Sequence, residues 1–341
     1  MKILVTGGAG YIGSHTILEI FQHTDWEVLS IDNYINSSPE SYDRVKNISG
    51  RSVDHAQIDL CDMDALRSVI SKHQFNGIMH FAALKAVGES VSEPGLYYRN
   101  NLLSLINLLE LQQEFKIPNH IYSSSCTVYG ASDALPVSEQ SPSGKAESPY
   151  GWTKVMGEQI LKDMTQDGKL FKSLALRYFN PVGAHSTGKI GELPIGIPNN
   201  LVPYITQTAA GHRECLTIHG NDYDTKDGTC IRDYVHVSDI AHAHVLAMRH
   251  LLDGKQDEPY DFINLGTGNG VSVQETVDTF MKVNDAALSF KYGPRRQGDV
   301  VSMYADNSKA KSILGWSPQR DLNEMMRSAW AWQKELDTQS L

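Results

Sequence analysis

The chain of 341 residues is long enough for about two domains, and its composition, 41% hydrophobic and 21% charged, is that of a folded globular protein rather than a disordered one. Forty acidic residues against thirty basic ones give a formal net charge of −10, which argues against a nucleic-acid-binding protein. The four cysteines, Cys61, Cys126, Cys215 and Cys230, form no CxxC pair, so we expect a reducing, cytoplasmic location and neither a metal site nor a disulfide framework.

Short apolar runs alternate with amphipathic stretches through the first half of the chain. A stretch of leucines at 102–111 is interrupted by polar residues, so it does not predict a membrane span. The alternation predicts βαβ units and an α/β fold with a Rossmann-like, doubly wound parallel sheet. The expected strands are 3–5, 28–31, 78–81, 120–122 and 173–177, and the expected helices are 11–23, 64–73, 97–115 and 150–166.

The sequence changes in character after about residue 180, because residues 180–200 are rich in Pro and Gly. Further helices are expected near 200–211, 238–253, 272–284 and 321–337. We therefore predict a nucleotide-binding Rossmann domain at 1–180 and a smaller, C-terminal substrate-binding lobe at 181–341. Whether some segments of the second half return to the main sheet stays open.

A glycine-rich turn joins the first strand to the first helix. Gly7, Gly10 and Gly13 form a GxxGxxG pattern, in which glycine lets the backbone approach a pyrophosphate and the helix N-terminus offers free N–H groups. Such a site binds a diphosphate without net cationic charge. Asp32, at the end of the second strand, suits the hydroxyls of a ribose and would repel a 2′-phosphate. These residues predict NAD rather than NADP as the cofactor.

Tyr150 and Lys154 are spaced to share one face of the expected helix 150–166, which follows the strand expected at 120–122. A lysine ammonium and a nicotinamide cation near the phenol would lower its pKa from about 10 towards neutrality. The tyrosine could then act as base and acid on a substrate hydroxyl, with Ser125 sharing the hydrogen bond to the reacting oxygen. Tyr42 and Lys46 have the same spacing but lie at the adenosine end, whereas Tyr150 lies near the carboxyl ends of the strands, where ligands bind.

These residues belong to longer motifs that resemble the extended short-chain dehydrogenase/reductase family, most closely its UDP-glucose 4-epimerase branch, over nearly the whole chain. The motifs are TGGAGYIGSH at 6–15, DN at 32–33, HFAALKAVGES at 80–90, SSSCTVYG at 123–130, PYGWTK at 149–154, RYFNPVGAH at 177–185, GIPNNLVPY at 196–204, GNDYDTKDGTCIRDYVHV at 220–237 and RRQGDV at 295–300.

The resemblance implies reversible epimerisation of UDP-galactose and UDP-glucose at C4, through a transient 4-keto sugar, with tightly bound NAD. It makes Tyr150 the base, with Lys154 and Ser125 as its partners. The residues it implies for NAD, beyond these three, are Gly7, Gly10, Tyr11, Ile12, Gly13, Asp32, Asn33, Tyr34, Asn36, Ser37, Asp59, Leu60, Phe81, Ala82, Ala83, Lys85, Asn100 and Phe179. Those implied for the UDP-sugar, besides Lys85, Ser125, Tyr150 and Phe179, are Asn180, Asn200, Leu201, Thr217, Ile218, His219, Arg232, Arg296, Asp299 and Met303.

The chemistry of the substrate set agrees with that role. Arg232 and Arg296 suit diphosphate oxygens, and Asp299 suits the uridine ribose hydroxyls. The structural alternatives are ion pairs of Arg232 with Asp233 or Asp239, and of Arg296 with Asp299.

By the same resemblance, Met303 takes the position that sets the size of the sugar pocket. A bulky Tyr there favours unmodified hexoses, and Cys or Ser admits N-acetylated ones. Methionine is long but flexible. We expect UDP-galactose and UDP-glucose as the main pair, with UDP-N-acetylhexosamines or another UDP-sugar as the alternative.

The acidic side chains that catalyse two related reactions, dehydration and decarboxylation, are absent from the matching positions of this chain. The nucleotide-sugar 4,6-dehydratases carry an Asp-Glu pair where this chain has Cys126 and Thr127, and UDP-glucuronate decarboxylases carry a Glu nearby. A remote alternative is a non-catalytic NAD-sensing regulator, which would be expected to have lost the Tyr150–Lys154 pair. The family usually forms homodimers through helices that correspond to 97–115 and 150–166. The leucines on several faces of the first helix are consistent with such an interface, and equally with a helix buried in the core.

Overall fold

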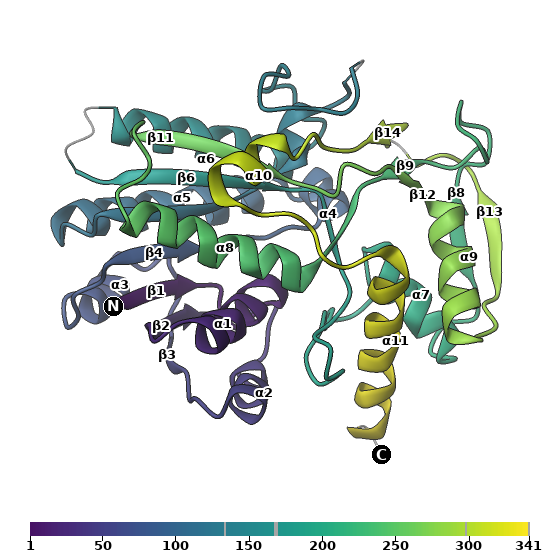
Figure 1. Ribbon diagram of the computed structural model, residues 1–341, viewed down its shortest axis with the longest axis horizontal. Coiled ribbons are helices and arrows are strands. Elements are labelled where there is room, and N and C mark those ends of the chain that lie inside the picture. Colours follow the sequence, from purple (N-terminus) through teal and green to yellow (C-terminus); the bar gives the residue numbers. More distant parts are fainter. Residues whose placement is uncertain (133, 167–169, 297–298, 340–341) are drawn as a thin grey trace.

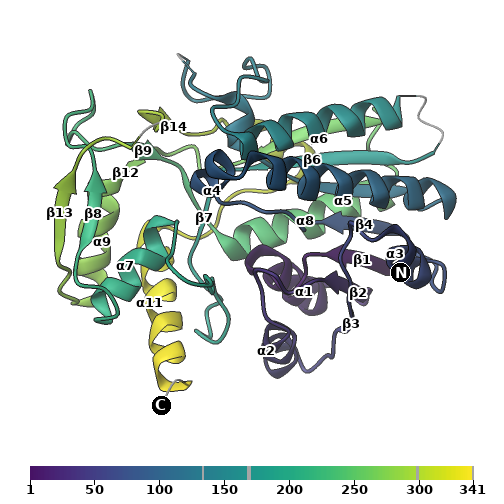
Figure 2. The ribbon, with the colours of Figure 1, turned by 180° about the vertical axis from the view of Figure 1, so that it is seen from behind.

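Seven parallel strands form the central sheet, with helices on both faces (Figures 1 and 2). The computed structural model describes residues 1–132, 134–166, 170–296 and 299–339. The strand order is β11-β6-β5-β4-β1-β2-β3, and all neighbours are parallel. The strands are β1 (Lys2–Thr6), β2 (Glu27–Asp32), β3 (Asp54–Gln57), β4 (Gly77–His80), β5 (Asn119–Ser125), β6 (Lys172–Tyr178) and β11 (Tyr260–Leu265).

Helical layers cover both faces of the sheet, because successive residues of a strand bury their side chains on opposite faces. Ile3 and Val5 of β1 belong to the core shared with α1 and α8, whereas Leu4 belongs to the core shared with α3 and α5. The first layer holds α1 (Tyr11–His23), α2 (Glu40–Ser49) and α8 (Val237–Leu252), and the second holds α3 (Met63–Ile70), α5 (Pro94–Glu114) and α6 (Pro149–Thr165).

The second lobe is built from short strand pairs and three helices around a core of its own. The strands pair as β7 (Asn180–Val182) with β10 (Tyr234–His236), β8 (Leu216–His219) with β13 (Phe290–Gly293), and β9 (Ile231–Arg232) with both β12 (Val271–Ser272) and β14 (Ser302–Met303). The helices are α7 (Leu201–Ala209), α9 (Val273–Asn284) and α11 (Leu322–Gln339). Short elements complete the chain: α4 (Val87–Ser92), the 3-10 turn η1 (Cys126–Tyr129) and α10 (Ser308–Leu314).

The predicted fold class, a doubly wound parallel sheet, is confirmed. The helix at Tyr11–His23 matches its expected bounds, and the other expected elements differ by a few residues at their ends. For example, the helix expected at 64–73 already ends at Ile70. Asp62 starts that helix because its carboxylate accepts the N–H of Ala65.

Segments from the second half also belong to the main sheet. β11 pairs with β6, and α8 packs against α1, although both come after residue 180. The division of the chain at residue 180 stays a prediction. Within the described part of the chain, the helices are all too short or too polar to cross a membrane.

Candidate active site

The carboxyl ends of the parallel strands bring most of the predicted cofactor residues to one edge of the sheet (Figure 1). The order of the strands reverses between β1 and β4, and ligands of doubly wound sheets bind at such a point. The residues at this edge are Gly7, Gly10, Tyr11, Ile12 and Gly13 after β1, Asp32, Asn33, Tyr34, Asn36 and Ser37 at and after the end of β2, Asp59 and Leu60 after β3, Phe81, Ala82, Ala83 and Lys85 after β4, Ser125 at the end of β5, and Phe179 after β6.

The turn after β1 requires glycine at two positions. Gly7 has a φ of +72°, and a Cβ on it would lie 2.6 Å from the backbone nitrogen of Ala82. A Cβ on Gly13 would lie 2.3 Å from the carbonyl oxygen of Gly7. The glycines therefore let the first turn of α1 pack directly against the strand end and the β4 loop.

The N-terminus of α1 is open to a ligand. Its N-cap is Gly10, which has no side chain to cap the helix, and no acidic residue lies in the first turn. The first N–H groups of a helix have no partner within it, and together they carry a partial positive charge. This turn therefore fits a diphosphate, as the GxxGxxG pattern predicts.

Asp32 anchors the same loop from β2. The residue is 8% exposed. Its carboxylate accepts hydrogen bonds from the backbone N–H of Ala9 at 3.0 Å and of Tyr34 at 2.9 Å, and from the Ser37 hydroxyl at 2.8 Å. A carboxylate has about four lone-pair sites, so it retains capacity for ribose hydroxyls. The carboxylate thus anchors the loop and keeps a lone-pair site free.

Tyr150 and Lys154 lie in the first turns of α6, opposite the end of β5. The Ser148 hydroxyl accepts the N–H of Gly151 at 3.1 Å and so starts the helix. The Lys154 ammonium is buried, donates to the carbonyl oxygen of Ser123 at 2.6 Å, and lies 5.9 Å from the centroid of the Tyr150 ring. The strand end therefore fixes the lysine beside the tyrosine ring.

The side chains of the protein by themselves leave the pKa of Tyr150 above its ordinary value, and the lowering expected with a bound nicotinamide cation stays a prediction. Burial raises the pKa of Tyr150 to about 12, hydrogen bonding from Ser125 opposes that rise, and Cys126 adds to it. Burial is therefore the largest cause of the raised pKa of Tyr150. Burial lowers the pKa of Lys154 to about 8, and the carboxylate of Glu158 opposes that fall.

The sequence reasoning missed Glu192, which joins the two lobes. Its Oε1 atom lies 2.9 Å from Nζ of Lys85, in the loop after β4, and accepts a hydrogen bond from Nδ2 of Asn200 at 2.7 Å. Asn200 starts α7. Both partners are predicted ligand residues, so Glu192 connects the cofactor side to the substrate side. Its only sequence signal was a charge within the Gly- and Pro-rich segment at 180–200.

Arg232 is paired with Asp299, at 3.4 Å from Nη2 to Oδ1, and donates to the carbonyl oxygen of Val300 at 2.6 Å. The alternative pairings predicted for Arg232 are wrong. The carboxylate of Asp233 instead accepts backbone N–H groups, including that of Ala305, and Asp239 pairs with Arg320.

The second lobe approaches the end of β5 through Arg232. Its charge acts on the thiol of Cys126, which directly follows Ser125; burial raises the pKa of that thiol to about 12, and Arg232 opposes the rise. Met303 lies opposite Arg232 in the pairing of β14 with β9 and is buried. The arginine and the methionine therefore lie on the side of the lobe that faces the active site.

The other predicted substrate residues are spread over the second lobe. His219 ends β8, and its Nδ1 lies 3.3 Å from the carbonyl oxygen of Pro294. β8 and β13 form the end of the lobe away from the central sheet (Figures 1 and 2). The remaining positions are Asn180 on β7, Leu201 on α7, Thr217 and Ile218 on β8, and the exposed Arg296 between β13 and β14. Two residues of the 295–300 motif, Gln297 and Gly298, lie outside the described residues.

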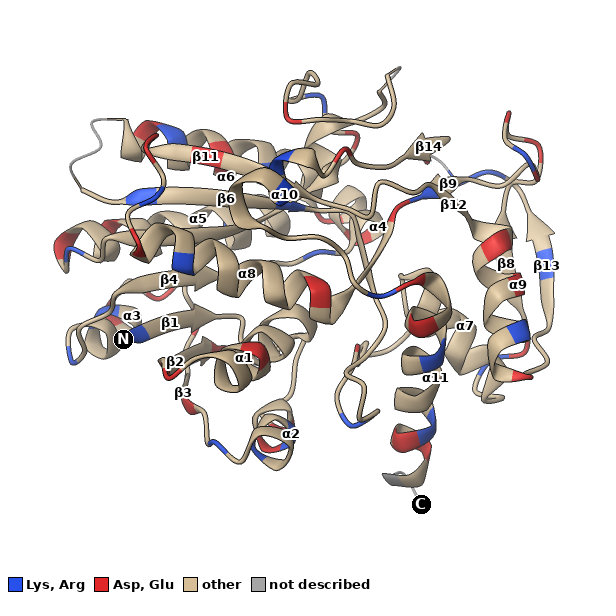
Figure 3. Cartoon of the chain, viewed as in Figure 1, with Lys and Arg blue, Asp and Glu red and all other residues tan. Residues whose placement is uncertain are grey.

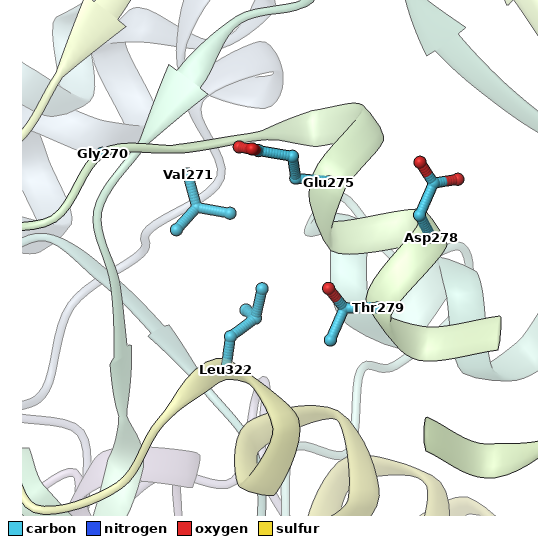
Figure 4. A pocket seen from close by; sticks show the side chains of 6 residues that line it. All are labelled: Gly270, Val271, Glu275, Asp278, Thr279 and Leu322. Atoms are coloured by element: carbon cyan, nitrogen blue, oxygen red, sulfur yellow. The ribbon is translucent and has the colours of Figure 1, made fainter. Parts of the chain in front are cut away.

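Of two surface cavities in the described part of the chain, the larger lies elsewhere. It has a volume of about 360 Å³ and lies between α9 and the start of α11, where Glu275, Thr279 and Leu322 line it (Figure 4). None of the predicted site residues lines it. A smaller cavity of about 30 Å³ lies beside Tyr11 and Glu192.

Charges are interspersed over both lobes (Figure 3). Within the described ranges, no group of three or more His, Cys, Asp or Glu could hold a metal ion.

Known proteins resemble the chain over almost its full length. A family model described as GDP-mannose 4,6 dehydratase matches residues 4–329. The UDP-glucose 4-epimerase of Erwinia amylovora is 48% identical over 335 residues, which cover 98% of each chain. The crystal structure of UDP-glucose-4-epimerase from Stenotrophomonas maltophila, with bound NAD and formylated UDP-arabinopyranose, has a TM-score of 0.95 at 42% identity and covers 99% of both chains. That of UDP-glucose 4-epimerase from Bifidobacterium longum, in complex with NAD⁺ and UDP, has a TM-score of 0.94 at 42% identity and covers 98% of both.

Proposed function

The chain belongs to the GDP-mannose 4,6-dehydratase family of extended short-chain dehydrogenases/reductases and, within it, to the UDP-glucose 4-epimerases; from this premise we propose that it interconverts UDP-galactose and UDP-glucose at C4 through a transient 4-keto sugar. One observation of the structure carries the proposal. Tyr150, Lys154 and Ser125 meet at the end of β5, on the sheet edge that also carries the glycine turn.

The residues of the first half suit NAD. The open first turn of α1 holds the diphosphate, and Asp32 holds the adenosine ribose. When bound, NAD supplies a hydride acceptor and a positive charge. The other residues proposed to line it are those at the carboxyl edge of the sheet, together with Asn100 on α5 and Tyr150 and Lys154 on α6.

Tyr150 moves the proton. As a phenolate it takes the proton of the sugar 4-hydroxyl while the C4 hydride would pass to the bound cofactor, and it returns the proton when the hydride comes back to the other face, so that C4 passes through a ketone and ends with inverted configuration. Ser125 orients the 4-oxygen. Because burial raises the pKa of Tyr150 to about 12, the phenol needs cationic neighbours to act as a base near neutral pH, and the Lys154 ammonium is one of them.

The second lobe holds the UDP-sugar. Arg232 and Arg296 bind the diphosphate, and Asp299 binds the uridine ribose. Since Arg232 is paired with Asp299, the substrate competes with that ion pair or joins it. The sugar itself needs weaker contacts, because it must present its other face between the two hydride transfers.

Unmodified hexoses are the proposed main substrates. The support is Met303, a long side chain that is 5% exposed and packs in the main core. UDP-N-acetylhexosamines remain the alternative substrates. The elimination of water, as in the 4,6-dehydratases, would need acidic side chains after Ser125, where this chain has Cys126 and Thr127.

We further propose a cytoplasmic homodimer. Large apolar side chains are exposed on the α4, α5 and α6 face: Val87, Val91, Leu96, Leu103, Trp152 and Met156. Exposed apolar patches of this kind mark protein interfaces. The cytoplasmic location is supported by the cysteines, which are all free.

The direct test uses protein purified without added cofactor. A denatured portion is tested for released NAD, and the rest is assayed on UDP-galactose and UDP-N-acetylgalactosamine. We expect bound NAD and faster turnover of UDP-galactose. No 4-epimer product from either sugar would contradict the assignment, and equal rates on both would contradict the preference for hexoses.

A further inference from the structure

The inner face of α6 carries three polar residues one turn apart: Tyr150, Lys154 and Glu158. Each one meets one of three consecutive serines at the end of β5. Ser125 hydrogen-bonds to Tyr150, the Ser123 carbonyl accepts from Lys154, and the Ser124 hydroxyl donates to Oε1 of Glu158 at 2.5 Å. The helix and the strand are thus matched residue by residue, and the third pair has no assigned part in the reaction.

Glu158 is held from a second strand as well. Arg177 of β6 stands directly opposite Ser124 in the sheet register. Its guanidinium makes a two-pronged ion pair, with Nε 2.9 Å from Oε1 and Nη2 2.5 Å from Oε2 of the carboxylate. Glu158 is 8% exposed and Arg177 is 2% exposed. One carboxylate therefore ties α6 to two neighbouring strands.

The guanidinium has its own fixed surroundings. It donates to the Tyr129 hydroxyl at 2.9 Å and lies 3.8 Å from the centroid of the Phe262 ring. A buried ion pair of this kind adds little net stability, because removing both charges from water offsets their attraction. Folding alone therefore gives a weak reason for placing a charged carboxylate one turn from Lys154.

Burial and charge have opposite effects on Lys154. Burial favours the neutral amine, and the carboxylate of Glu158 favours the ammonium. The other titratable groups that face the lysine are Tyr150 on its own helix, Tyr122 on β5 and His80 on β4. Burial raises the pKa of Tyr122 and lowers that of His80, so both are uncharged at neutral pH. Around Glu158 lie Arg177 and Tyr260.

We propose that Glu158 is a positioning residue of the active site, which keeps Lys154 protonated and fixes α6 against β5 and β6. It acts through Lys154 and touches no reacting atom. The inference rests on the proposed function, because the charge of Lys154 matters to the reaction through Tyr150.

The test compares Glu158→Gln with a matched control, Glu139→Gln. Glu139 is another carboxyl of the same polar network: it accepts the N–H of Asn264 at 2.8 Å, and the side chain of Asn264 accepts from Tyr129. It does not contribute to the pKa of Lys154. Two quantities are measured: the pH profile of kcat on UDP-galactose, and the pKa of Lys154 from the NMR titration of 13C-labelled lysines, whose signal is assigned with Lys154→Arg.

In Glu158→Gln we expect the alkaline limb of the kcat profile and the NMR pKa of Lys154 to move down by about one pH unit. In Glu139→Gln both should stay where the wild type has them. A uniform fall in kcat with an unmoved limb and an unmoved NMR pKa would overturn the proposal, since it would leave Glu158 a purely structural role.

A variant without partners for Arg177 risks poor folding. The double variant Glu158→Gln/Arg177→Met removes both buried charges and should fold, and the same downward shift is expected in it. If it folds and the pKa of Lys154 is unmoved, the inference fails. Absence of epimerase activity in the wild type would instead contradict the proposed function, whereas the NMR titration would still test the effect of Glu158 on Lys154.

Discussion

The phenol of Tyr150 is the residue on which the proposed chemistry depends most directly. Replacement by Phe removes the proton acceptor and leaves the ring in place. We expect kcat on UDP-galactose to fall by about 10² to 10⁴-fold. Bound NAD should be retained, because the glycine turn and Asp32 are unchanged.

The control is Tyr42→Phe, which has the same spacing to a lysine, at Lys46. Tyr42 is buried against Ser30, with the two hydroxyls 2.7 Å apart, so its loss should lower stability slightly and leave kcat nearly unchanged. Unchanged turnover in Tyr150→Phe would show that another group moves the proton.

Single residues also show where sequence reasoning ends. The spacing of Tyr150 and Lys154 correctly placed both on one helix face. The direction in which the pKa of Tyr150 shifts could not be read from spacing, because burial is its largest cause. Glu192 was missed for a related reason. Its partner Lys85 is far away in the sequence, and no sequence motif links it to its other partner, Asn200.

At the scale of elements, the close packing of α1 on β1 is open to a matched test. In Gly13→Ala the new methyl group would meet the Gly7 carbonyl at 2.3 Å, so α1 must shift. We expect a loss of about 1–3 kcal/mol in the free energy of unfolding, together with loss of retained NAD.

The control for this variant is Gly88→Ala. Gly88 lies in α4, and a Cβ there would meet nothing within 4 Å. Alanine is the better helix former, so this variant should be as stable as the wild type or more so. Denaturant unfolding and NAD release measure both variants, and equal behaviour would contradict the packing account.

Elements were predictable from sequence in proportion to their length and periodicity. The helix Tyr11–His23 has a clear apolar period and a glycine turn before it. β3 could not be delimited, because its residues, Asp54–Gln57, are mostly polar and form the edge strand of the sheet. The two-residue strand β9 exists only through its pairing with β12 and β14, which come much later in the chain.

The whole molecule should lose stability as the pH falls. Burial lowers the pKa of His15 and His244 to about 4, and of His120 and His236 to about 3, from 6.5. The unfolded chain takes up protons on these rings below about pH 6.5, whereas the folded chain does not until about pH 4. Their contribution is therefore fully present above about pH 6.5 and is lost as the pH falls through that window.

Thermal unfolding between about pH 8 and pH 5 tests this, with each ring contributing up to about 1.4 kcal/mol per pH unit. Tm should be level above about pH 6.5 and fall steeply below it. A Tm that stays level down to about pH 5 would show that these rings are not buried as described.

The proposed dimer is likewise a property of the whole molecule. Leu103 and Met156 are 38% and 39% exposed on α5 and α6. The double variant Leu103→Asp/Met156→Asp should be monomeric by light scattering, because it places charges at the proposed interface. Ile313→Asp, at a 42% exposed position on α10, is the control and should remain dimeric. A monomeric wild type would contradict the proposal.

In the proposed reaction, one C–H bond at C4 is broken and remade by hydride transfer, and Tyr150 moves only the hydroxyl proton. The most direct measurement converts UDP-galactose in D₂O without added cofactor and locates deuterium in the product by NMR. We expect UDP-glucose with no deuterium at C4, because a transferred hydride does not exchange with solvent. Deuterium at C4, or no UDP-glucose at all, would contradict it.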